Sequence, residues 1–170
     1  MNTMGRNIAF FFMLLLASCS SGQNSKEQNE DTDIFNYGDN LEDGVVGTWK
    51  NTEIDVEIST YNNTDTSFNV VVNESSWSVI MNMNPIYTWI KEDGTFYTEY
   101  RDTLNQVFHT NGGIWYIDGD SLFLKDERGF MFPYRVLIKD NEMEMKTLVD
   151  YDEDGKKDDF YFGKYRKVKE

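Results

Sequence analysis

The residues best suited by type and spacing to a chemical role form an acidic run near the end of the chain. Carboxylates stand at alternate positions, a glycine follows the third of them, and Lys156 supplies a backbone carbonyl at position seven. This order matches the first nine positions of a calcium loop, although Tyr161 replaces the glutamate expected at position twelve. Two interpretations stay open: an acidic hairpin turn, or a calcium site that pins the hairpin with ligands from Asp150, Asp152, Asp154, Lys156 and Asp158.

The single cysteine of the chain predicts where the protein resides. Arg6 precedes an apolar run over residues 8–16 that is too short to span a bilayer, and Leu16-Ala17-Ser18-Cys19 follows. This segment resembles the signal peptides of bacterial lipoproteins. The resemblance implies cleavage before Cys19 and lipidation of its sulfur, so we expect a membrane anchor in the bacterial cell envelope, at the outer membrane. The alternative is an ordinary cleaved signal peptide in which the cysteine is incidental.

Catalytic chemistry finds little support in the residue types. Cys19 is assigned to the anchor, and His109 is the only imidazole. No serine stands in a nucleophile-elbow motif, and with 30 acidic residues any chosen carboxylate pair is uninformative. We interpret His109 as an exposed strand residue before a turn at residues 111–113. The sequence therefore predicts a protein that is not an enzyme.

Charge and composition divide the chain into three parts. A formal net charge of −14 disfavours nucleic acid and anionic headgroups as partners and favours cationic ones. Residues 20–41 are polar and acidic and are nearly devoid of the apolar side chains that would order them. We expect a signal peptide at residues 1–18, a lipid-anchored flexible tether at 19–43 and one folded domain at 44–170. The tether is either a solvated spacer or an export address.

The folded part shows the two-residue period of β-strands. Apolar residues recur at alternate positions over residues 54–58, 77–83 and 130–138, and Asx-Gly pairs mark tight turns at short intervals. Pro133 lacks a ladder donor and predicts an edge, a bulge or a barrel corner. We therefore expect an all-β, up-and-down antiparallel meander that closes into a barrel.

Four segments in order carry a resemblance to the lipocalin-like domains of bacterial lipoproteins. They are Val45-Val46-Gly47-Thr48-Trp49-Lys50, Asp93-Gly94-Thr95-Phe96-Tyr97, residues 113–124, and Tyr161-Phe162-Gly163-Lys164-Tyr165-Arg166-Lys167. The resemblance implies that the tryptophan of the Gly-x-Trp motif closes one barrel end and that an arginine near the last strand packs across it. Gly47, Trp49 and Arg166 would then form this end, with the guanidinium over the indole.

The interior of the barrel decides between two functions. Apolar side chains at alternate positions either line a ligand cavity or fill a solid core. A cavity predicts an envelope-anchored binding protein for a small apolar molecule. A filled barrel with an apolar outer patch predicts a protein that docks another envelope protein or a cationic partner. The candidate lining residues are Trp77, Val79, Met81, Met83, Trp89, Phe96 and Phe132.

Overall fold

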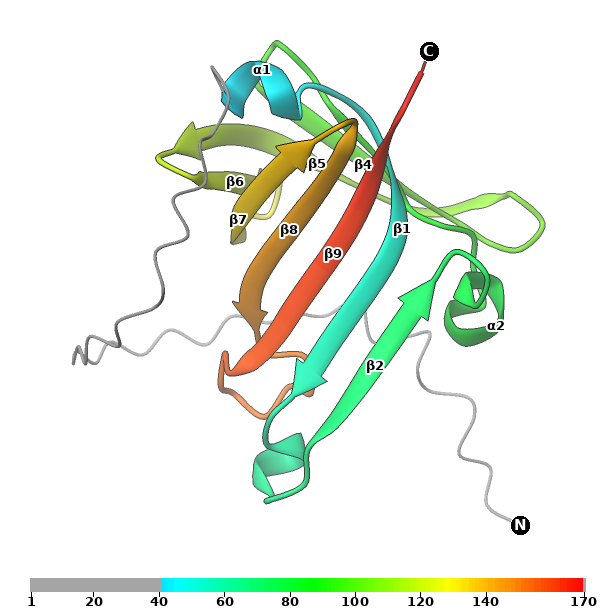
Figure 1. The fold of residues 1–170 in the computed structure, drawn as a ribbon, viewed down its shortest axis with the longest axis vertical. Coiled ribbons are helices and arrows are strands. Elements are labelled where there is room, and N and C mark those ends of the chain that lie inside the picture. Colours follow the sequence, from blue (N-terminus) through cyan, green and yellow to red (C-terminus); the bar gives the residue numbers. More distant parts are fainter. Residues whose placement is uncertain (1–40, 170) are drawn as a thin grey trace.

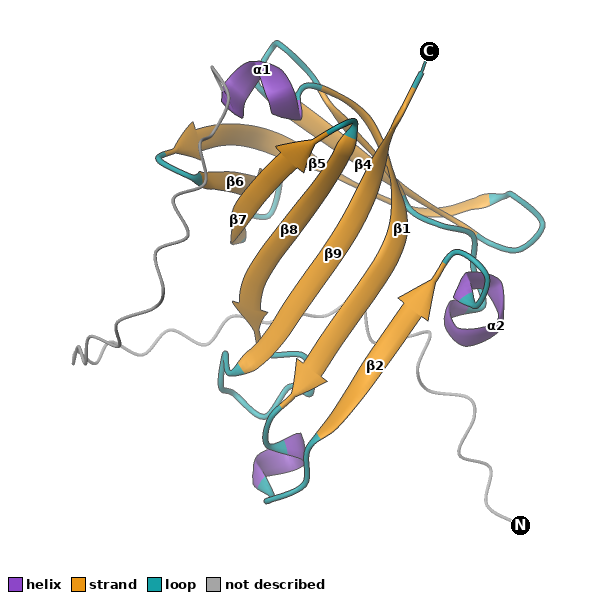
Figure 2. Ribbon diagram, in the orientation of Figure 1, coloured by secondary structure: helices purple, strands orange, loops and turns teal. Residues whose placement is uncertain are grey.

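The computed structural model describes residues 41–169 (Figure 1). The expected signal peptide, Cys19 and the tether up to residue 40 lie outside the described residues. The strands are β1 (Gly47–Ile58), β2 (Phe68–Asn73), β3 (Tyr87–Ile90), β4 (Thr95–Arg101), β5 (Val107–Asp118), β6 (Ser121–Asp126), β7 (Met131–Lys139), β8 (Glu142–Val149) and β9 (Asp159–Val168). Short helical segments are α1 (Leu41–Val45), η2 (Tyr61–Asn63) and α2 (Trp77–Met81) (Figure 2).

The strands form a closed antiparallel barrel, as the sequence predicts. Each of β3 to β8 pairs with the next strand along the chain, and β9 pairs with β1. The first part of β1 pairs with β3, from Gly47 to Lys50, and the later part pairs with β2, from Glu53 to Ile58. Eight strands therefore close the barrel, while β2 takes the place of β3 beside the later part of β1.

The two ends of the barrel differ. Tight turns join β3 to β4, β5 to β6 and β7 to β8 at one end, where Gly94, Gly119, Asp140 and Asn141 adopt positive φ. The helix α1 packs at this same end, against β5 and β7. The opposite end carries longer connections, including the acidic loop between β8 and β9 (Figure 1). The first described helix, α1, begins at Leu41, three residues before the residue at which the sequence predicts the domain to start.

Residues 77–83 do not form the expected strand. They contain the helix α2, which ends at Asn82 in the left-handed conformation. Trp77 and Met81 are four residues apart, so they share one face both in a strand and in a helix, and both are buried. Val79 distinguishes the two structures, because a helix directs it away from that face, and it is 83% exposed.

The turn expected at residues 111–113 is also wrong, because these residues lie inside β5. Gly113 pairs with Asp126 of β6, and a Cβ on Gly113 would collide with the backbone of Lys125 and Asp126. The glycine therefore permits a close approach between two strands rather than a reversal of the chain.

The row of alternating residues from Phe130 to Ile138 is confirmed as β7. Pro133 pairs with Phe123 of β6, while the pairing of β7 with β8 begins only at Arg135. The proline thus occupies a position that β8 does not flank, which agrees with the edge character predicted for it.

The buried apolar residues form two clusters. One packs around Trp49 beneath α1, and the other packs around Trp77 between α2, β2 and the later part of β1. No helix among residues 41–169 is long and apolar enough to cross a bilayer.

Candidate functional site

Trp49 seals the barrel end beneath α1. Its side chain is fully buried, and its Nε1 donates a 2.7 Å hydrogen bond to the carbonyl of Val45 in α1. The cation over its ring is Lys167, whose Nζ lies 5.2 Å from the ring centroid. Gly47 makes room for it, because φ is +144° there and a Cβ would collide with the Lys167 side chain.

Lys167 therefore occupies the position over the Trp49 ring that was predicted for Arg166. Trp49 lies opposite Lys167 in the β1–β9 register, and Arg166 lies opposite Lys50. Since successive side chains of a strand point to opposite faces, only one of the two cations can reach the ring. Arg166 points outward and pairs with Glu74, with 3.3 Å between Nη1 and Oε2.

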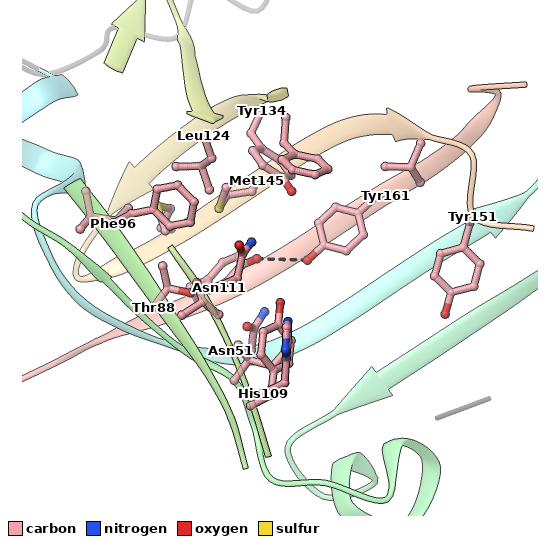
Figure 3. Close-up of a pocket in the computed structure, with 18 of the residues that line it drawn as sticks. Asn51, Thr88, Phe96, His109, Asn111, Leu124, Tyr134, Met145, Tyr151 and Tyr161 are labelled. Carbon is pink, nitrogen blue, oxygen red and sulfur yellow. Dashed lines mark hydrogen bonds between the residues drawn. The ribbon is translucent and has the colours of Figure 1, made fainter. Parts of the chain in front are cut away.

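A cavity of about 240 Å³ occupies the barrel interior (Figure 3). Its apolar walls come from β3, β4, β6, β7 and β8, and from Ile86 just before β3. The principal apolar side chains that line it are Ile86, Ile90, Phe96, Leu124, Phe132, Met143 and Met145.

Four tyrosines bring polar groups to this apolar space. The hydroxyls of Tyr161 and Tyr165 on β9 lie 3.1 Å apart and share a hydrogen bond. Gly163 stands between them on the same face, and a Cβ there would lie 2.6 Å from the Tyr161 hydroxyl. The Tyr-x-Gly-x-Tyr spacing therefore lets the two rings lean together over a residue without a side chain. Tyr100 and Tyr134 complete this group of four, and Tyr151 of the acidic loop is a fifth tyrosine that lines the cavity.

Burial keeps these hydroxyls neutral. Desolvation raises the pKa of Tyr100 to about 12. It also raises the pKa of Tyr134 and Tyr161 far above the usual range, with a smaller contribution from nearby tyrosines. Burial raises the pKa of Tyr165 as well, although the Tyr161 hydroxyl and the Asn51 amide offset part of this rise. The interior therefore offers neutral hydrogen-bonding groups.

Charged lining residues are gathered at the end opposite α1. Arg128 follows β6, while Asp150 and Glu153 belong to the loop after β8. Arg128 is exposed and pairs with the buried carboxylate of Asp126 at 2.8 Å. His109 lies nearby on β5, half-buried against the ring of Tyr100, with 5.1 Å between centroids. His109 is therefore a cavity-lining residue and not the exposed one expected.

The candidate lining residues separate into three groups. Phe96 and Phe132 line the cavity. Trp77, Met81 and Met83 are buried in the cluster beneath α2, and Val79 faces solvent. Trp89 points outward, because its inward neighbours Thr88 and Ile90 alternate with it on β3. The polar residues that line the cavity were not predicted, because an asparagine or tyrosine at a single position does not form a periodic pattern that shows which face of a strand points inward.

The acidic loop assembles a different set of carboxylates from the one expected. One oxygen each from Asp150, Asp152 and Asp159 lies within 4.8 Å of the others. Asp159 was not among the predicted ligands. It is buried, and desolvation raises the pKa of its carboxyl although backbone N–H groups of Tyr151 and Ser59 donate to it.

The other predicted ligands are directed toward the segment after β1. Asp154 accepts hydrogen bonds from the backbone N–H groups of Asn63 and Lys156, at 3.2 and 2.9 Å. Asp158 accepts a 3.2 Å hydrogen bond from the Thr60 hydroxyl. These bonds fasten the acidic loop to η2, and binding of calcium here stays a prediction.

Aromatic side chains also gather on the outer face of the barrel. Trp89 on β3 stacks with Tyr87 at 6.1 Å between ring centroids and lies tilted against Tyr97 on β4 at 5.7 Å. On β5 and β6, the rings of Tyr116 and Phe123 stack in parallel at 4.9 Å. This outer aromatic face has no contact with the cavity, because its residues alternate with the inward ones.

Comparison with known proteins leaves the chain without a family. No family model matches it, and no curated protein matches it. Among solved structures, one similar chain is the Cpx pathway activator NlpE from Escherichia coli, with 26% identity and a TM-score of 0.28. The alignment covers 36% of this chain and 33% of that one, so this chain spans about a third of the NlpE chain. The functional assignment therefore rests on the geometry of the site.

Proposed function

We propose that this protein is a non-catalytic binding protein of the bacterial cell envelope that holds a small, largely apolar molecule inside its barrel. The observation that carries the proposal is the 240 Å³ cavity, with apolar walls and a few convergent polar groups. Trp49 and α1 cover one end of the barrel, so a ligand enters at the end that bears the acidic loop.

The size of the cavity limits the ligand. Pockets for drug-sized molecules span about 300–1,000 Å³, so this one suits a smaller molecule. The charges near the entrance do not suit an anion, because Asp150 and Glu153 lie there and Arg128 is already paired with Asp126. We therefore favour an uncharged ligand.

Lipidation at Cys19 would place the barrel at a membrane surface, close to molecules that partition between lipid and water. A chain carrying Cys19→Ala is expected to stay unlipidated and uncleaved, since only the thiol can accept the diacylglycerol. Metabolic labelling with a fatty-acid analogue measures this directly. Label on the Cys19→Ala chain would contradict the anchor.

The outer aromatic face supports a second candidate function, docking of another envelope protein. Tyr97, Ile114, Tyr116 and Met131 are exposed there, and aromatic residues and methionine are enriched at interfaces. A partner captured through this face would be lost on Tyr97→Ala with Tyr116→Ala, whereas a cavity ligand would be retained.

Native mass spectrometry of the protein purified from its own host tests the cavity. We expect a bound small molecule that leaves on mild activation. Asn111→Phe places a ring into the cavity and is expected to abolish the adduct. Thr110→Phe is the matched control, because Thr110 is the exposed neighbour on β5. Absence of any adduct, or an adduct that survives Asn111→Phe, would contradict the proposal.

A further inference from the structure

Asn51 on β1 carries a buried amide N–H group that lacks an acceptor. The residue is 1% exposed and lines the cavity, and although its amide lies close enough to the Tyr165 hydroxyl to interact with it, its Nδ2 makes no hydrogen bond of normal geometry among the described residues. Its backbone N–H is satisfied by the carbonyl of Ile86 at 2.9 Å. Buried polar atoms are nearly always paired, so an unpaired donor that faces a cavity indicates a missing acceptor.

The backbone of β1 fixes Asn51 in this position. The pairing of β1 with β9 shifts between Asn51 and Glu53, so Thr52 is an extra residue in the strand. Trp49 and Asn51 point inward before the bulge, and Ile54 points inward after it. The Thr52 hydroxyl donates to the carbonyl of Lys164 at 3.2 Å, which holds the bulge closed.

The surroundings of Asn51 supply further hydroxyl groups. The hydrogen bond between Tyr161 and Tyr165 uses one of the two hydroxyl protons and leaves the other to donate. The hydroxyls of Thr88 and Thr98, which also line the cavity, are paired with each other at 3.1 Å. Figure 3 shows Asn51 in the cavity together with Thr88, Asn111 and the dashed bond from Tyr161.

We propose that Asn51 is the polar anchor of the cavity and that the ligand is an uncharged molecule whose buried end carries a carbonyl oxygen. The amide Nδ2 donates to this oxygen, and the free hydroxyl proton of the tyrosine pair is a second donor within the same wall. The apolar body of the ligand then lies against Phe96, Leu124 and Met145. This inference rests on the proposed binding function.

Two probes of the same shape separate the inference from the function it rests on. Acetophenone carries a carbonyl oxygen at the position where α-methylstyrene carries a methylene group, and the two molecules are otherwise the same. Each is titrated into the chain without residues 1–18, carrying Cys19→Ala, and followed by 1H–15N NMR. We expect both to bind and acetophenone to bind roughly 2- to 10-fold more tightly, the contribution of one net hydrogen bond.

The side-chain amide of Asn51 provides the direct readout in the unaltered barrel. Its protons are expected to move downfield with acetophenone and not with α-methylstyrene. Asn51→Leu is expected to remove the preference between the probes while both still bind. Asn69→Leu, which alters an exposed amide on β2, is the matched control and keeps the preference. If Asn51→Leu does not fold, the amide shifts alone decide.

Each outcome has one meaning. Equal binding of the two probes, or a preference that survives Asn51→Leu, overturns the role of Asn51 and leaves the binding function standing. Benzoate is titrated as a third probe, and tighter binding of benzoate than of acetophenone overturns the uncharged ligand in favour of an anion held near His109. No binding of any probe overturns the binding function itself.

Discussion

Single residues at the ends of β1 and β9 decide which side chains enter the barrel. Trp49 and Lys167 face each other across the two strands, and Gly47 leaves the space that the lysine occupies. The family resemblance predicted that Arg166 packs over the Trp49 ring, because the family places an arginine there. The two-residue period of the strand instead places Lys167 on the same face as Trp49. The register of neighbouring strands is therefore a better guide to a contact than the identity of the cation.

Lys167→Ala is expected to lower the free energy of unfolding by about 1–2 kcal/mol, because it removes the cation from a fully buried indole. Arg166→Ala is expected to lower it by less than about 1 kcal/mol, since its ion pair with Glu74 is exposed. Urea unfolding of the two variants measures the difference. A larger effect from Arg166→Ala would restore the original assignment.

Gly163 gives a second residue-scale prediction. Gly163→Ala places a methyl group against the Tyr161 hydroxyl and is expected to destabilise the fold by about 1–3 kcal/mol through overpacking. Gly44→Ala is the matched control, because Gly44 lies in α1, where alanine is the better helix former, and meets only Ile138 at 3.3 Å. Equal thermal stability of the two variants would show that the tyrosine pair tolerates a wider spacing.

At the scale of elements, the sequence predicts a strand correctly where apolar residues recur at every second position and do not also fit the 3.6-residue period of a helix. The row in β7 is unambiguous, and β9 follows the Tyr-x-Gly-x-Tyr spacing. In α2, the pair Trp77 and Met81 fits both periods, so tertiary packing decides between them. The bulge in β1 leaves a trace in the sequence, since inward residues change from odd numbers at Trp49 to even numbers at Ile54.

The loop between β8 and β9 carries the element-scale prediction. Asp150, Asp152 and Asp159 repel one another without a cation, so calcium at a hundredfold excess over its Kd is expected to add about 2.7 kcal/mol of stability. This raises Tm by several degrees. Asp152→Ala with Asp154→Ala is expected to abolish the rise. An equal rise with magnesium would identify ionic screening and an ordinary acidic turn instead.

At the scale of the whole molecule, the barrel was predictable and its interior was not. Alternation and turn chemistry define each hairpin locally, and closure follows because it leaves few unpaired edges. Whether the interior holds a cavity depends on how the inward side chains of all eight strands pack together. The sequence of a single strand does not contain this information. Phe96 and Phe132 were predicted as lining because they are apolar. Asn51 and the four tyrosines were missed because their burial is a property of the closed barrel.

The buried tyrosines make the whole fold sensitive to alkaline pH. In the unfolded chain a tyrosine ionises near pH 10, whereas burial holds the folded pKa of Tyr100 at about 12 and that of Tyr134, Tyr161 and Tyr165 above the usual value. Below pH 10 both states are neutral and the stability is fully present. Above it only the unfolded state releases protons, so the stability falls as pH rises toward the folded pKa values.

Each of the four tyrosines is expected to remove about 1.4 kcal/mol of stability per pH unit in this range. For a domain of ordinary stability, unfolding should then occur within roughly two pH units above pH 10. Urea unfolding as a function of pH, with tyrosinate absorbance as a second signal, measures the slope. Tyr100→Phe should lessen the slope by about one tyrosine's share while leaving the pH dependence between pH 7 and 9 unchanged, because no tyrosine ionises there. If the slope is the same in Tyr100→Phe as in the parent chain, the Tyr100 hydroxyl is not held neutral by burial and the cavity is wetter than its walls indicate.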